Sequence, residues 1–135
     1  MKLELKENMY IRTKDGHIDK ILLVEYAEEK RQQYPNHLSK KYWRDKILLL
    51  KAGYWRTTQN IIKASYNIVD ILEVGDILVD DTNRKLEILL IDNELMVRNT
   101  GLIYDNNYYL PIKSIAIKSV ITHEQMEQMA YRVGE

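Results

Sequence analysis

The dipeptide Asp15-Gly16 constrains the fold of this chain more than any other local feature. It lies between two β-prone runs, residues 9–13 and 17–25. An Asp-Gly pair in this setting is a strong hairpin signal, because glycine adopts a positive φ without steric cost. We therefore expect a β-hairpin over residues 9–25, at the start of a mainly β fold.

Short apolar runs bounded by turn residues continue to the end of the chain and predict more strands. Asn67 is placed to cap a helical turn over 67–72, and Thr122 with Gln125 forms a capping-box pattern that begins a helix reaching about residue 128. A turn is expected at Asp92-Asn93. The predicted strands after the first hairpin cover residues 42–50, 54–58, 60–65, 76–79, 84–91, 94–98, 102–105, 108–113, 114–119 and 130–133.

A weak internal repeat predicts two similar units. The pattern of a short strand, a polar turn and a long apolar strand in 10–24 recurs in 76–91, and the run 62–65 before a capped turn recurs at 117–120. The offset between the copies shrinks along the chain by about the length of most of the polar loop 26–41. The first copy therefore carries that loop as an insertion.

Each repeat is long enough for about five short strands, so we expect one or two small SH3-like β-barrels in tandem, with short helical turns. The expected units are residues 1–73 and 74–135. One continuous sheet is the alternative, since any two antiparallel meanders share this pattern. The loop 26–41 is polar and contains Pro35, and a short helix is expected over 26–33. Long loops of small β folds often carry function.

No catalytic or metal-binding motif is recognisable. The chain has no cysteine, which excludes disulfides, thiolate nucleophiles and cysteine metal sites. None of His17, His37 and His123 has a second ligand at metal-binding spacing. The five glycines are isolated, so no phosphate-binding loop can form. We therefore expect a protein that is not an enzyme and has no cofactor and no metal.

Several acidic residues of the C-terminal half could meet at one end of a barrel and hold a hard cation. The calcium-loop pattern is not met, however, because the run Asp81-Thr82-Asn83-Arg84-Lys85 puts a cation where a third oxygen ligand is needed. Turn formation explains these carboxylates better. They are Asp76, Asp80, Asp81, Asp92 and Glu94.

The sequence is typical of a cytoplasmic protein without a membrane partner. Its first eight residues alternate polar and apolar side chains and lack the apolar region of a signal peptide. The longest apolar runs are too short to cross a bilayer. The absence of cysteine fits a reducing cytosol.

A formal net charge of zero conceals a basic central segment. Residues 1–29 carry a net charge of −2, residues 30–56 of +7 and residues 57–135 of −5. Such a segment favours an anionic partner. It could equally neutralise the acidic parts of its own fold or oligomer.

The basic segment also contains both tryptophans, each within a Tyr-Trp-Arg tripeptide. In a strand over 42–50, residues 47–50 should enter the core and the Lys40–Arg44 end should lie at the rim. The candidate partner-binding residues are Lys40, Lys41, Tyr42, Trp43, Arg44 and Arg56.

Three uses of these residues remain open. Trp, Tyr and Arg dominate protein interfaces, which favours a protein partner. Stacking of bases on the rings with phosphates on the cations would favour a single-stranded nucleic acid. Trp43 and Trp55 could instead be core residues beside snorkelling arginines.

Three segments of the chain carry a family resemblance: residues 9–16, residues 118–126 and the block Ile62-Lys63-Ala64-Ser65-Tyr66-Asn67-Ile68-Val69-Asp70-Ile71-Leu72-Glu73-Val74-Gly75-Asp76. They resemble a group of small phage and prophage proteins of Gram-positive bacteria, especially clostridia. The resemblance implies a phage context and no particular activity. Small phage accessory proteins often block host enzymes or defence systems. We therefore expect a non-catalytic protein that binds and inhibits a host protein; a nucleic-acid-binding accessory protein or a structural phage component that forms homo-oligomers are the alternatives.

Overall fold

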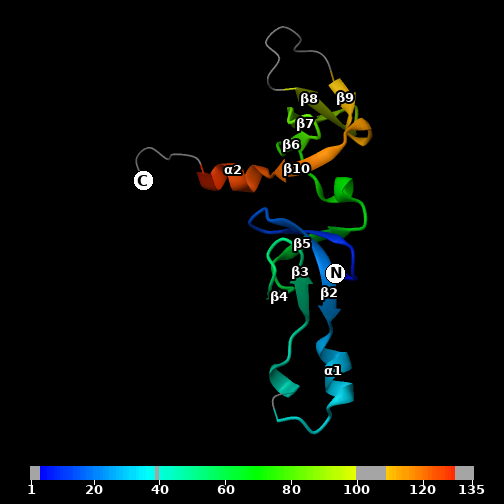
Figure 1. Ribbon diagram of the computed structural model, residues 1–135, viewed down its shortest axis with the longest axis vertical. Coiled ribbons are helices and arrows are strands. Elements are labelled where there is room, and N and C mark those ends of the chain that lie inside the picture. Colours follow the sequence, from blue (N-terminus) through cyan, green and yellow to red (C-terminus); the bar gives the residue numbers. More distant parts are fainter. Residues whose placement is uncertain (1–3, 39, 100–108, 130–135) are drawn as a thin grey trace. The chain divides into compact units, whose positions relative to one another are not determined.

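The computed structural model describes residues 4–38, 40–99 and 109–129. Over these residues the chain is mainly β, as expected, and all of its paired strands are antiparallel. The chain divides into two compact units, Met1–Ile71 and Leu72–Glu135. The boundary expected from the sequence is two residues farther on. Each unit is described on its own below (Figure 1).

Unit 1 contains a sheet with the strand order β4-β3-β2-β1-β5 over its described residues. The hairpin predicted at Asp15-Gly16 is confirmed: Tyr10 pairs with Lys20, and Gly16 has a φ of 86°. The strands are β1 (Tyr10–Thr13), β2 (Ile18–Glu25), β3 (Lys46–Leu49), β4 (Trp55–Thr57) and β5 (Ile61–Ser65).

Strand β2 pairs with two neighbouring strands along its length. Its first residues pair with β1, and Ile21 to Glu25 pair with β3. The register with β3 shifts between Ile21 and Leu23. A shift of this kind bends a strand and increases its twist. The bend allows one strand to join the β1–β5 and β3–β4 parts of the sheet.

The core of unit 1 forms from alternate residues of these strands, as the two-residue period of a strand requires. Ile11, Ile21, Ile47 and Leu49 are each at most 1% exposed, and Leu5 packs with them. The expectation that all of residues 47–50 are core is wrong, because β3 alternates: Leu48 is half-buried and Leu50 is 58% exposed.

Helical turns interrupt the strands of unit 1 at the predicted places, with one correction. Helix α1 (Ala27–Gln33) lies in the loop as expected, and Asn67 Oδ1 accepts the Val69 amide at 3.1 Å to cap η2 (Ile68–Ile71). The strand expected from residue 42 begins only at Lys46, because the 3₁₀ turn η1 (Lys40–Tyr42) precedes it.

Unit 2 repeats this strand order as β10-β6-β7-β8-β9 over its described residues. The capping box is confirmed, since the Thr122 amide donates to Gln125 Oε1 at 3.1 Å and the Gln125 amide donates to Thr122 Oγ1 at 3.3 Å. The elements are β6 (Ile77–Asp80), β7 (Lys85–Ile91), β8 (Glu94–Asn99), β9 (Tyr109–Pro111), η3 (Ile112–Ser114), β10 (Ile117–Ile121) and α2 (His123–Met129). Predicted strands 102–105 and 130–133 lie outside the described residues.

The internal repeat seen in the sequence corresponds to equivalent places in the two sheets. The matched segments 10–24 and 76–91 form β1–β2 and β6–β7, and the second matched pair forms β5 and β10. In the described parts of the chain the strands form two sheets rather than one continuous sheet, and neither sheet closes, since β4 does not pair with β5 nor β9 with β10.

Asp80 closes the turn between β6 and β7. Its Oδ1 accepts the amides of Thr82 at 3.0 Å and Arg84 at 2.8 Å, and its Oδ2 accepts Arg84 Nε at 2.7 Å. Burial opposes ionisation of this carboxyl, but the hydrogen bonds from Arg84 and Thr82 outweigh it and lower the pKa of Asp80 to about 2.

We expect the stability of unit 2 to depend on this carboxylate. Because the folded pKa is depressed, the contribution of Asp80 is present above its usual pKa of 3.8 and is lost as the pH falls through about 2. Acid unfolding of Asp80→Asn, followed by the amide NMR signals of β6 and β7, should lack this component. Identical acid unfolding of the two proteins would contradict the assignment.

Candidate interaction surface

The segment between β2 and β3, described over residues 26–38 and 40–45, forms a protrusion from the sheet of unit 1 that we call the α1–η1 protrusion (Figure 1). Asp45 closes its base, because Asp45 Oδ1 accepts the amide of Ala27 at 2.9 Å at the start of α1. The acidic Glu28 and Glu29 lie in the first turn of α1, where the helix dipole favours negative charge. The helix ends before Pro35, as the conformational restriction on the residue preceding proline predicts.

Trp43 lies at the centre of the α1–η1 protrusion and is half-buried. The Tyr34 ring meets it edge to face at a centroid distance of 6.4 Å, and the His37 ring lies 5.1 Å away. Lys30 Nζ lies 4.7 Å from its ring centroid, within the range of a cation–π contact. The Trp43 carbonyl oxygen accepts a hydrogen bond from Arg31 Nη2 at 2.9 Å. Trp43 therefore holds α1 to the segment after η1.

Other large apolar and aromatic side chains of the protrusion remain exposed. Leu38 is 94% exposed, Tyr42 is 67% exposed and Tyr34 is 55% exposed. Lys41 Nζ lies 5.0 Å from the Tyr42 ring. The protrusion thus combines exposed apolar surface with positive charge.

The structure separates the candidate residues into two places. Lys40, Lys41 and Tyr42 form η1, and Trp43 and Arg44 follow directly, so these five belong to the α1–η1 protrusion. Arg44 donates to the carbonyls of Lys41 at 3.2 Å and of Trp43 at 3.0 Å, which stabilises the turn.

Arg56 lies on β4 and pairs with Ile47. It lines a small cavity of about 30 Å³ together with Thr13 and Asn60, and so belongs to the sheet. Trp55, beside it, is 43% exposed. Neither tryptophan is among the buried core residues of the described chain.

A second apolar surface crosses the outer side of β2, β3 and β4. Leu48 pairs with Leu23 on one side and with Trp55 on the other. Leu23 is 46% exposed, and Leu48 is half-buried. This row starts two residues from Glu25, where β2 ends and the protrusion begins. The apolar surface of the hairpin is therefore continuous in sequence with the protrusion.

The carboxylates that the sequence analysis grouped have separate structural roles. Asp80 binds Thr82 and Arg84, as described above, while Asp76 accepts the amides of Glu73 and His123. Among the described residues, Asp76, Asp80, Asp81, Asp92 and Glu94 do not form a three-ligand cluster.

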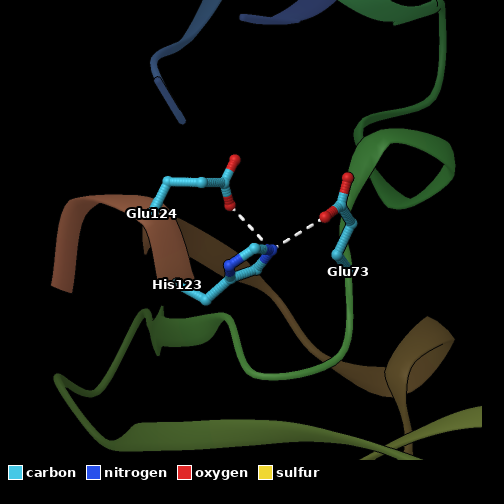
Figure 2. A group of neighbouring side chains, drawn as sticks. All are labelled: Glu73, His123 and Glu124. Atoms are coloured by element: carbon cyan, nitrogen blue, oxygen red, sulfur yellow. Dashed lines mark hydrogen bonds and ion pairs between the residues drawn. The ribbon is translucent and has the colours of Figure 1, made fainter. Parts of the chain in front are cut away.

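The three histidines have different neighbours. His17 Nε2 lies 2.9 Å from Asp19 Oδ2, and His37 contacts Trp43. His123 lies against Glu73 and Glu124 (Figure 2), an arrangement that the sequence analysis missed. Glu73 lies 50 residues from His123 in the sequence, so no local pattern connects the two. The capping box at Thr122 was the available signal, and it placed only His123 and Glu124 together.

Comparisons of the chain with protein-family models, with curated proteins and with solved structures find no match. In the described part of the chain, no helix combines the length and the apolar character needed to span a membrane.

Proposed function

We propose that this chain is a non-catalytic, phage-encoded protein that binds and inhibits a host protein in the host cytoplasm, using the α1–η1 protrusion. The observation that carries the proposal is the exposure of Leu38, Tyr42 and Tyr34 on the α1–η1 protrusion. The phage context and the inhibitory role rest on the sequence resemblance. The contact surface rests on the structure of unit 1.

Exposed apolar side chains of this size are unfavourable in water unless a partner covers them. Aromatic and arginine side chains supply most of the binding energy at protein interfaces, and leucine adds apolar area. Lys41 and Arg44 lie among them, so the partner surface that fits best is apolar at its centre and acidic at its rim. The Leu23–Leu48–Trp55 row supplies further exposed apolar area on the strands that flank the protrusion in the sequence.

A single-stranded nucleic acid fits this surface less well. Stacking requires an accessible ring face. The Trp43 ring is engaged by Lys30, Tyr34 and His37, so only the exposed Tyr34 and Tyr42 rings among the described residues of this surface are available for stacking. Leu38 offers neither a ring nor a charge to a nucleotide. Retention of a single-stranded oligonucleotide in a low-salt gel shift, with affinity falling steeply as salt rises, would favour this alternative instead.

The SH3-like character of each unit belongs to the same proposal. In both sheets the last strand lies beside the first, followed in order by the second, third and fourth. The register shift in β2 and the 3₁₀ turn η3 before β10 are further features that support it. In such folds the loops between strands frequently carry binding residues, which agrees with a contact surface on the insertion between β2 and β3.

The experiment compares capture of host proteins by the wild-type chain and by matched variants. Replacing Leu38 and Tyr42 by alanine should reduce capture of the specific partner by about tenfold or more, because two exposed anchor side chains are removed. Replacing Lys40, Lys41 and Arg44 by alanine should weaken binding with a strong dependence on salt. The control replaces the exposed Lys14, Lys51 and Lys113, which removes the same charge elsewhere.

Quantitative mass spectrometry of the captured proteins, followed by calorimetry with the purified partner, measures the effect. Circular dichroism should show that each variant keeps its β structure. Equal capture of the same host protein by the wild type and by Leu38→Ala/Tyr42→Ala would exclude the protrusion as the binding surface. Loss of capture in the Lys14/Lys51/Lys113 variant alone would place the site elsewhere.

A further inference from the structure

We propose that Glu73, His123 and Glu124 bind a divalent metal ion such as Zn²⁺. Both carboxylates approach the same ring nitrogen: Glu73 Oε1 lies 2.8 Å and Glu124 Oε1 lies 2.7 Å from His123 Nε2 (Figure 2). The three potential ligand atoms all lie within 4.8 Å of one another. This site belongs to unit 2 and is independent of the binding function proposed for the α1–η1 protrusion.

A single proton does not satisfy this arrangement well. An imidazole nitrogen carries at most one hydrogen, so it can direct one good hydrogen bond to one of the two oxygens. The carboxylates are also shielded from water, with side chains 26% exposed for Glu73 and 16% for Glu124. Two like charges brought together with reduced solvation repel each other. A divalent cation between the three atoms would be attracted by both carboxylates.

The observed distances require little rearrangement to admit an ion. Zinc bonds to nitrogen and oxygen are about 2.0–2.2 Å long, and a tetrahedral angle then separates neighbouring ligand atoms by roughly 3.3–3.5 Å. Each carboxylate would therefore withdraw from Nε2 by roughly 0.6 Å, which rotation of a glutamate side chain allows. His123 is 36% exposed on its side chain, which leaves an entry path and room for water as a further ligand.

The backbone on both sides of the cluster is held by one buried carboxylate. Asp76 is 0% exposed; its Oδ2 accepts the Glu73 amide at 2.8 Å and its Oδ1 accepts the His123 amide at 3.0 Å. The capping box at Thr122 fixes the first turn of α2, from which His123 and Glu124 project. Such supporting hydrogen bonds orient ligands before the metal arrives.

The donor set indicates which ions fit. One imidazole with two carboxylates suits Zn²⁺, Mn²⁺, Fe²⁺ or Co²⁺, whereas Mg²⁺ and Ca²⁺ prefer oxygen ligands alone. Because the ligands come from the segment before β6 and from the start of α2, a bound ion would link the beginning of unit 2 to its last described helix. Binding should therefore stabilise unit 2.

Titration of the full chain with ZnCl₂ by calorimetry tests the proposal, with CoCl₂ as a probe whose visible absorption reports ligand geometry. We expect one ion per chain, a higher midpoint of thermal unfolding with zinc, and reversal by a chelator. Glu73→Gln and Glu124→Gln should each weaken zinc binding by about tenfold or more, and His123→Ala should abolish it. His37→Ala removes a histidine of unit 1 and should bind zinc like the wild type.

Saturable zinc binding that is lost in His123→Ala and retained in His37→Ala would support the site. No saturable binding to the wild type, or unchanged binding by His123→Ala, would overturn it. If His123→Ala fails to fold, Glu73→Gln decides the question, because glutamine keeps the size of the side chain and a hydrogen bond to His123 while removing the charge. Unchanged zinc affinity in a folded Glu73→Gln would overturn the proposal.

Discussion

Replacing Asp19 by alanine is expected to destabilise unit 1 by about 4 kcal/mol, because three backbone donors would lose their shared buried acceptor together. The Asp19 side chain is 1% exposed. It accepts the amides of Lys20 at 2.8 Å, Lys51 at 2.7 Å and Ala52 at 2.9 Å, and it also meets His17. One carboxylate thus ties the first hairpin to the turn between β3 and β4.

The substitution Asp19→Asn separates the effect of the side-chain charge on stability from the effect of side-chain shape. Asp19→Asn keeps one oxygen acceptor but turns a donor toward an amide, so we expect a loss of about 2 kcal/mol, roughly half that of alanine. Urea unfolding followed by tryptophan fluorescence measures this, because both tryptophans belong to unit 1. The exposed Glu7→Gln is the matched control and should change little. A loss below 1 kcal/mol in Asp19→Ala would contradict the structural role.

The pH dependence of Asp19 has a defined sign. Burial raises the pKa of this carboxyl, but the amides of Lys51, Lys20 and Ala52 and the His17 side chain outweigh burial, and the pKa lies below its usual 3.8. The stabilisation from Asp19 is therefore complete above that value and is lost as the pH falls through the lowered folded pKa. The difference in stability between wild type and Asp19→Ala should shrink in that acid range.

The second large effect is expected at Arg12, which is 0% exposed on β1. Its Nη1 donates to the carbonyl of Ile71 at 3.1 Å, at the end of η2. Arg12→Ala removes both a large buried stem and this hydrogen bond, so we expect a loss of about 3 kcal/mol or more. The exposed Lys14→Ala, two residues along the chain, should be nearly neutral.

Methionine separates the two contributions of Arg12. Arg12→Met fills much of the same volume but donates no hydrogen bond, so we expect it to lose about 2 kcal/mol, less than alanine but more than a surface substitution. Chemical denaturation followed by tryptophan fluorescence gives both values. Wild-type stability in Arg12→Ala would show that the buried guanidinium contributes nothing net to folding.

Much of the element pattern was accessible from the sequence because its signals are local. The first hairpin depends on Asp15-Gly16, and the predicted turn at Asp92-Asn93 appears with φ values of 51° and 63°, as a tight hairpin turn requires. The caps at Asn67 and Thr122 likewise involve residues within three positions of each other. Such contacts are the same wherever the segment lies.

Predictions that depended on side-chain direction were less successful. Residues 42–45 contain aromatic residues and a β-like pattern, yet the contacts of Trp43 with α1 keep them out of β3. This displacement of the strand start places five of the candidate residues on the protrusion and leaves Arg56 on β4. The barrel expectation requires a pairing between the first and last edges that the described sheets do not show.

The sequence alone determined the β class, the internal repeat and the basic segment, since turns, caps and charges depend on residues close together in the chain. The tertiary structure decided which distant side chains meet: Asp19 with the amides of Lys51 and Ala52, Arg12 with Ile71, and Glu73 with His123. These partners are separated by 32 to 59 residues. Only the order and register of the strands bring such residues into contact, and no local pattern records that order.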